Sequence, residues 1–200
     1  MSERNEEVKK LAENAAGNDK KIAELSETLS VGSRRERQMA ASALALLAKS
    51  EPESLVPHID KFIDALNRPE AQTRWESLET LAVLVDHDAR NCNKAIPEAE
   101  ASLFDEESGP VRLAAMRFLC KLGSTTENRS EKVWPLIDEG IQCYHGDLEF
   151  NDMLIALVDF SNGKLSADVK KSFAERMAFD ASNGKGTLQR RAQQIVENLS

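Results

Sequence analysis

Residues 103–123 read LFDEESGPVRLAAMRFLCKLG, which is the apolar end of one segment, an acidic turn and then a second apolar segment. In the second segment, Met116 and Leu119 stand four and seven residues after Arg112. Residues at these two offsets share one face of a helix. The stretch therefore predicts two helices joined by a turn, the second with one buried face.

The same pattern recurs along the chain. The positions equivalent to Arg112, which we call the anchors, are spaced 37, 38, 38 and 38 residues apart: Arg37, Arg74, Arg112, Phe150 and Leu188. Apolar residues follow each of them at four and seven residues: Ala41 and Leu44, Leu78 and Leu81, Met116 and Leu119, Leu154 and Leu157, Ala192 and Ile195. A fixed period of this size indicates one supersecondary unit copied along the chain, each copy burying its apolar face on its neighbours.

Composition favours stacked helices over a sheet. Only 5% of the 200 residues are aromatic, and the formal net charge is −8, which disfavours wrapping a phosphate backbone. The first residues are charged and resemble no signal peptide, and no apolar run approaches the length of a membrane helix. The three cysteines are scattered, which predicts a reducing, cytoplasmic location without a disulfide framework.

The pattern predicts an N-terminal helix within residues 1–17, as a cap or a tail, and one repeat domain over 18–200. Its five helical hairpins, each with a first (A) and a second (B) helix, lie near residues 18–50, 51–88, 89–124, 125–162 and 163–200. The predicted helices are 6–16, then 19–29 with 34–49, 52–66 with 70–86, 94–104 with 110–122, 130–143 with 149–160, and 167–180 with 187–199.

Several residues suit the starts of these helices. Ser33 and Glu36 have the spacing of a capping box, as do Ser50 and Glu53, and Ser166 is a predicted N-cap. Apolar residues followed by a proline stand in three of the A helices, at Pro57, Pro97 and Pro135, where a helix would start or kink.

The third repeat resembles a HEAT repeat through Leu103, Asp105, Val111-Arg112, Ala115, Leu119 and Leu122-Gly123. The first two repeats share much of this pattern, whereas the last two are supported mainly by their spacing. The resemblance implies an all-α fold, a right-handed superhelical solenoid of the HEAT or armadillo type. It also implies that the B helices line a concave surface and that the protein is a binding scaffold.

The repeated arginines Arg37, Arg74 and Arg112 allow two interpretations. They could form a positive row for an acidic peptide or phosphates. Alternatively, each pairs with an acidic turn residue such as Asp105 and ties adjacent repeats together. We favour the second, structural interpretation, because it explains the regular spacing without a ligand.

The search for catalytic and metal-binding motifs is empty. The chain has no P-loop, GxGxxG, GxSxG or HExxH motif, and its histidines and cysteines lack zinc-ligand spacing. We therefore expect no catalytic residues, no cofactor and no metal. The basic clusters at Arg34-Arg35-Arg37 and Arg190-Arg191, with Trp75, Glu76 and Glu79, could serve a HEAT-like DNA glycosylase, but the acidic net charge opposes such binding. The alternative function is such an enzyme on nucleic acid, or a chromophore lyase.

The leading hypothesis is a non-catalytic scaffold or adaptor that binds a protein or peptide along the B helices. Positions five and nine residues after each anchor point away from the apolar face, beginning with Ser42 and Leu46. The predicted groove residues among them are Glu79, Val83, Arg117, Lys121, Ile155 and Asp159. We expect a protein or peptide partner, no nucleic acid, no membrane, and a monomer or weak self-association.

Overall fold

The computed structural model describes residues 3–200, and all regular secondary structure in this range is helical. The α-helices are α1 (Glu3–Ala15), α2 (Asp19–Val31), α3 (Arg34–Leu47), α4 (Pro52–Leu55), α5 (Ile59–Ala65), α6 (Ala71–Cys92), α7 (Ile96–Leu103), α8 (Gly109–Gly123), α9 (Glu127–Tyr144), α10 (Phe150–Ser161), α11 (Ala167–Asn183) and α12 (Gly186–Asn198). Two 3-10 helices, η1 (Val56–His58) and η2 (Asn93–Ala95), precede α5 and α7. Within residues 3–200, no helix combines the length and apolar character needed to cross a membrane.

The chain divides into two compact units, unit 1 (Met1–Ala115) and unit 2 (Met116–Ser200). The boundary between the units falls inside α8. The single repeat domain over residues 18–200 therefore stays a prediction.

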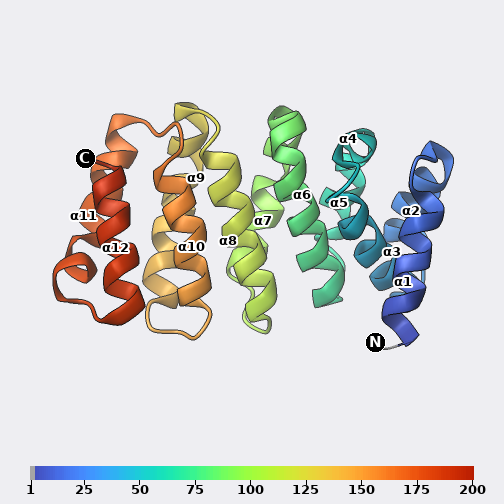
Figure 1. Cartoon of the computed structure of the whole chain (residues 1–200), viewed down its shortest axis with the longest axis horizontal. Coiled ribbons are helices and arrows are strands. Elements are labelled where there is room, and N and C mark those ends of the chain that lie inside the picture. Colours follow the sequence, from blue (N-terminus) through green and yellow to red (C-terminus); the bar gives the residue numbers. More distant parts are fainter. Residues whose placement is uncertain (1–2) are drawn as a thin grey trace. The chain divides into compact units, whose positions relative to one another are not determined.

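Unit 1 has two layers of helices. The A helix α2 packs on the B helix α3, and α5 packs on α6, as in helical hairpins. The A helices α2 and α5 also contact each other, and α3 contacts α6, so like helices lie side by side (Figure 1). The N-terminal helix α1 packs mainly on α3 and also on α2, as a cap over the first repeat would.

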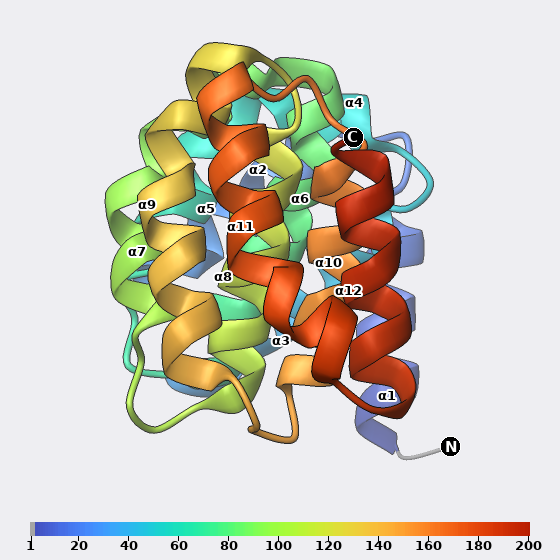
Figure 2. The same ribbon diagram turned by 90° about the vertical axis from the view of Figure 1, so that its left-hand side faces the viewer.

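Unit 2 repeats this layering. The A helices α9 and α11 lie on one side and the B helices α10 and α12 on the other (Figure 2). An aromatic cluster fills the core of unit 2, where the ring of Phe173 lies 5.0 Å from Trp134 and 5.7 Å from Phe160 between centroids. Phe160 and Phe173 are both fully buried.

The predicted apolar face of the B helices is confirmed. All ten residues at four and seven positions after the anchors are at most 1% exposed: Ala41, Leu44, Leu78, Leu81, Met116, Leu119, Leu154, Leu157, Ala192 and Ile195. Burial of this face against neighbouring helices supplies the main driving force for stacking. Each unit is thus held together by the side chains that define the repeat in the sequence.

Polar contacts also join residues about one repeat apart. In unit 1, Ser30 donates a hydrogen bond to Asp64, and Lys94 pairs with Asp60, both across 34 residues. In unit 2, Arg176 donates two hydrogen bonds to the carboxylate of Asp138, across 38 residues. The separation of 38 residues equals the period of the sequence and that of 34 residues lies about one helical turn below it, because adjacent repeats pack side by side.

The A helix of the second repeat differs from the prediction. Instead of one helix over residues 52–66, the chain forms α4, the 3-10 turn η1 and α5. Pro57 lies in η1, and a proline ring has no N–H to donate and clashes with the preceding turn of an α-helix. The proline therefore breaks the predicted helix into two short ones.

The helix α6 joins the B helix of the second repeat to a short helical segment that ends at Cys92. The two parts meet at Asp88, whose φ of −151° and ψ of 70° are not helical, so the B helix ends close to the predicted Asp86. The Asp88 carboxylate accepts a hydrogen bond of 3.0 Å from the backbone N–H of Asn91. This side chain caps the last turn of α6, which explains why helix resumes after the kink.

Two of the three predicted helix starts are confirmed. Ser33 and Glu36 form the capping box of α3, and the Ser166 hydroxyl caps α11. The capping box at Ser50 and Glu53 is wrong, because the Ser50 hydroxyl donates to the Leu47 carbonyl instead. The first helix of the fourth repeat also begins earlier than predicted, at Glu127 after the N-cap Thr126.

Candidate functional site

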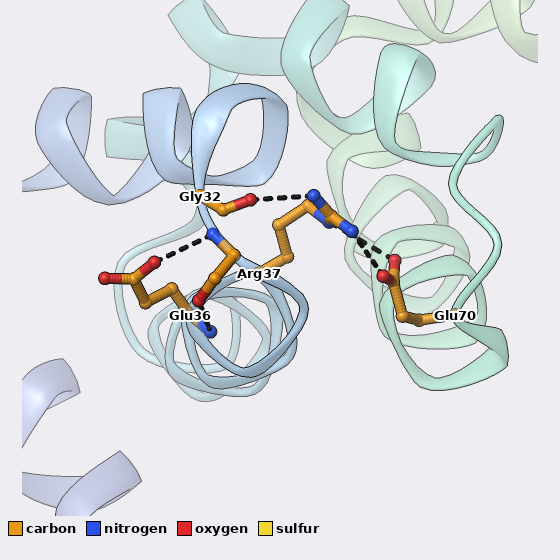
Figure 3. A network of polar contacts seen from close by, with 5 residues as sticks. Gly32, Glu36, Arg37 and Glu70 are labelled. Atoms are coloured by element: carbon orange, nitrogen blue, oxygen red, sulfur yellow. Dashed lines mark hydrogen bonds and ion pairs between the residues drawn. The ribbon is translucent and has the colours of Figure 1, made fainter.

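The arginine Arg37 of α3 pairs with Glu70, which directly precedes α6 (Figure 3). Its Nε donates to one carboxylate oxygen of Glu70 at 3.2 Å, and its Nη2 donates to the other. Its Nη1 donates to the Gly32 carbonyl at 2.7 Å. The Glu70 side chain is only 3% exposed, and the hydrogen bonds from Arg37 lower the pKa of its carboxyl group. The pair joins the first two repeats.

The arginine Arg74 makes the corresponding contact one repeat later. Its Nη1 lies 2.6 Å from the Asp105 carboxylate, in the turn before α8. The third arginine, Arg112, donates to the backbone carbonyl of Asp105 at 2.8 Å, within its own repeat. Asp105 also accepts hydrogen bonds from the backbone N–H groups of Glu107 and Ser108, which fixes the turn.

A cavity of about 960 Å³ lies in unit 1 on the exposed side of the B-helix layer. We call it the α1/α3/α6 groove, after the helices that line it. Its lining residues are Arg4, Asn5, Val8 and Lys9 from α1, Ser42, Ala45 and Leu46 from α3, Lys49 from the turn after α3, and Gln72, Glu76, Glu79, Thr80 and Val83 from α6.

The groove gathers four residues that the repeat places at equivalent positions. Ser42 and Glu79 stand five residues after their anchors, and Leu46 and Val83 stand nine after them. The predicted groove residues Glu79 and Val83 therefore line a common cavity. The N-terminal helix forms one wall of it, which the sequence pattern did not reveal.

A polar network crosses the groove. The Ser42 hydroxyl lies 2.9 and 2.8 Å from the two carboxylate oxygens of Glu76, and it accepts a hydrogen bond of 3.0 Å from Gln72. Arg4 of α1 donates to the Gln72 side-chain oxygen at 2.8 Å. This chain of contacts links α1, α3 and α6 through side chains that face the cavity.

Glu76 is the half-buried carboxylate of this network, and burial raises the pKa of its carboxyl group. The folded state therefore holds the Glu76 proton more tightly than the unfolded chain does. The stabilisation that protonated Glu76 gives the folded state is complete below the unfolded-state pKa. It is lost as pH rises through the folded-state pKa.

We expect Glu76→Gln to melt at a higher temperature than the parent protein at neutral pH, because the amide keeps its hydrogen bonds without a buried charge. The difference should disappear once the pH falls below the unfolded-state pKa, and circular dichroism melts from neutral to acidic pH measure it. Glu131→Gln removes an equally charged but exposed carboxylate of α9 and should show no such trend. A lower melting temperature of Glu76→Gln at neutral pH would contradict the expectation.

The other predicted groove residues lie in unit 2. Arg117 and Lys121 stand one turn apart on α8, and Ile155 and Asp159 one turn apart on α10. Arg117, Ile155 and Asp159 are exposed, and Lys121 is half-buried. Ile155 is 45% exposed, which is unusual for an isoleucine in a helix of this core-forming layer.

The basic clusters make contacts within the chain. Arg35 pairs with Glu7 of α1 at 3.2 Å, which ties the N-terminal helix to α3. Arg190 donates to the Thr187 hydroxyl, and Arg191 donates to the Asn151 carbonyl. These contacts use part of the donor capacity that a nucleic-acid site would need.

The cysteines and histidines do not gather. Cys92 and Cys120 are buried and Cys143 is exposed, and all three are free thiols. Burial raises the pKa of the Cys120 thiol well above its usual range. His145 contacts the buried Asp180 carboxylate at 3.0 Å. Within the described residues, no group of three or more His, Cys, Asp or Glu side chains could hold a metal ion.

The fold is similar to that of several solved structures of engineered and designed proteins. An engineered protein is 19% identical with a TM-score of 0.75, covering 100% of this chain and 93% of its own. A designed armadillo repeat protein is 14% identical with a TM-score of 0.74, covering 96% and 92%. Another, solved in complex with the peptide (KR)4, is 15% identical with a TM-score of 0.75, covering 96% and 91%.

These similarities show the fold. No protein-family model matches the chain, and no curated protein matches it. The chain has an all-α helical repeat fold of the HEAT or armadillo type, as the sequence pattern predicted.

Proposed function

We propose that the chain is a non-catalytic scaffold that binds a segment of another protein in the α1/α3/α6 groove. The observation that carries this proposal is a cavity of about 960 Å³ on the exposed side of the B-helix layer, lined by apolar and polar side chains. Cavities of this size with mixed lining are typical of binding sites. The likeness to a designed armadillo repeat protein that holds a peptide adds support.

The lining of the groove favours binding over catalysis. The Ser42 hydroxyl lies close to the Glu76 carboxylate, an arrangement that could suggest a nucleophile and its base. Both residues stand inside helices, where the backbone N–H groups already donate to helical carbonyls. The backbone donors that would stabilise an oxyanion are therefore committed elsewhere.

The proposal extends to the partner and the compartment. A protein partner, and no nucleic acid, suits the net charge of −8. Three free cysteines, one of them exposed, support work in the reducing cytoplasm. We propose that the chain works as a monomer or with weak self-association.

The proposal is tested by selecting short random peptides on the full chain and mapping bound peptides by hydrogen exchange. Bound peptides should slow exchange in α1, α3 and α6. Recovery of no binders, or protection confined to other helices, would reject the groove as the binding site.

We expect Leu46→Asp to weaken such peptides about tenfold or more, because the aspartate places a charge on the apolar part of the groove. Leu46 is 36% exposed, so the change should leave folding intact. Leu148→Asp is the matched control, since Leu148 is 96% exposed and does not line the groove. Fluorescence polarisation with a recovered peptide measures both variants, and equal affinities would contradict the expectation.

In unit 2, Arg117, Lys121, Ile155 and Asp159 are proposed as further contacts for the same kind of partner. Adding Ile155→Asp to the polarisation series examines this part of the proposal separately. A weakened peptide would support these contacts, and an unchanged affinity would contradict them.

A further inference from the structure

The Glu76 carboxylate at the α1/α3/α6 groove has few hydrogen-bond donors. An ionised carboxylate can accept about four hydrogen bonds. Ser42 has one hydroxyl proton, and this proton is shared between Glu76 and the Gln38 carbonyl, which lies 3.0 Å from the same oxygen. The Gln72 amide approaches the Glu76 oxygens only at 3.4 and 3.5 Å, the outer limit of a hydrogen bond.

Both donors to Glu76 in the described residues are neutral. The guanidinium group nearest along the network, that of Arg4, donates to the oxygen of Gln72. A half-buried carboxylate with weak neutral donors gains stabilisation from a cation that enters the groove. The Glu76 carboxylate faces the cavity and can accept further hydrogen bonds. We therefore expect a ligand with a positive charge and N–H donors.

Three apolar residues line the groove beyond Glu76, beside Glu79, Thr80 and Lys49. Ala45 and Leu46 of α3 and Val83 of α6 line it further along the two helices. Leu46 is exposed and Val83 is half-buried, so an apolar side chain placed on them would remove apolar surface from water. A ligand that fits both parts carries a cation next to an apolar group.

The remaining charges of the groove limit the number of cations. Arg4, Lys9 and Lys49 line the same cavity as Glu76 and Glu79. A run of basic side chains would meet these three cations and be repelled. A single basic side chain at Glu76 avoids most of this repulsion.

Resting on the proposed function, we propose that the groove binds a peptide segment with one lysine or arginine beside Glu76 and a neighbouring apolar side chain on Leu46 and Val83. The basic side chain donates hydrogen bonds to the Glu76 carboxylate, and the apolar side chain covers Leu46 and Val83. The partner is thus a protein segment with an isolated basic residue, not a basic run.

The test uses the peptides recovered from the random library on the full chain. Recovered peptides should share one basic residue next to an apolar one. Synthetic versions with arginine or its neutral isostere citrulline are then titrated by calorimetry into the parent protein, Glu76→Gln and the control Glu131→Gln.

Citrulline should weaken binding about tenfold or more in the parent protein and in Glu131→Gln, and far less in Glu76→Gln. The peptide (KR)4 should bind no tighter than the single-arginine peptide at physiological salt. An equal citrulline effect in all three proteins, recovered peptides without a basic residue, or tighter binding of (KR)4 would overturn the inference.

These outcomes separate the inference from the proposed function. Some peptides could bind more weakly to Leu46→Asp and yet bind equally well with arginine or citrulline. This result would support the groove as a binding site and contradict the inference that it binds a basic side chain. Recovery of no peptide would reject both. The citrulline comparison on the parent protein stands even if Glu76→Gln folds poorly.

Discussion

Phe173→Ala is expected to lower the free energy of unfolding by about 4 kcal/mol, the largest effect among the substitutions considered. Phe173 is fully buried in unit 2, and its ring lies against Trp134 and Phe160. Alanine would remove most of this contact surface and leave a cavity that the neighbouring rings fill only in part. Urea unfolding followed by circular dichroism measures the change.

The control for this variant lies on the same helix. Phe179 of α11 is 73% exposed, so Phe179→Ala removes the same ring from water-facing surface. We expect a change within about 0.5 kcal/mol for it. Similar urea midpoints for the two variants would show that the aromatic cluster contributes less than its burial indicates.

Arg37→Ala is expected to lower the free energy of unfolding by about 3 kcal/mol at neutral pH. The variant leaves the Glu70 carboxylate buried without its cation, and it also removes the hydrogen bond to the Gly32 carbonyl. Removing one partner of a buried pair costs more than the pair itself contributes, because the remaining charge stays out of water. Urea unfolding again measures the loss.

The loss should depend on pH. The pKa of Glu70 is lowered in the folded protein by its hydrogen bonds with Arg37, so the stabilisation is present above the unfolded-state pKa. It is lost as pH falls through the lowered folded-state pKa. The difference between Arg37→Ala and the parent protein should therefore shrink in acid.

Arg35→Ala is the control, two residues earlier on the same helix. Arg35 pairs with Glu7 at the surface, where both side chains are more than a third exposed. Its loss should cost less than about 1 kcal/mol. An equal cost for Arg35→Ala and Arg37→Ala would contradict the structural role of the buried pair.

The helix faces could be predicted from the sequence because they depend on local periodicity. Residues such as Leu81 and Leu119 repeat at fixed offsets from an anchor, and the offset alone places them on the buried side. The capping box of Ser33 and Glu36 is equally local. Ser50 and Glu53 have the same spacing, but Pro52 starts a helix within it, and the predicted cap does not form.

The partners of the arginines were less accessible from the sequence. Asp105 can be predicted as a partner because it stands in the acidic turn of the repeat that is easiest to recognise. Glu70 cannot, since a lone acid after Pro69 has no feature that separates it from an exposed residue. Its position 33 residues after Arg37, close to the 31 between Arg74 and Asp105, was the available signal.

The groove depends on the distances between side chains of α1, α3 and α6, and the repeat pattern of the sequence does not give these distances. The offsets of Glu79 and Val83 from their anchor place both residues on the predicted groove face. Glu76 stands only two residues after the anchor, and the sequence relates it only to the alternative nucleic-acid site. Its hydrogen-bond donors are Ser42 of α3 and Gln72, and Gln72 in turn accepts a hydrogen bond from Arg4 of α1. The sequence left open whether the N-terminal helix was a cap or a tail, so it could not supply this wall.

The distribution of the three thiols has a practical consequence for these experiments. Cys143 is exposed and does not line the groove, whereas Cys92 and Cys120 are buried. A maleimide fluorophore would therefore attach to the native sequence at a single known point in the last turn of α9. The unmodified chain thus carries its own labelling position, and no cysteine needs to be engineered into it or removed from it.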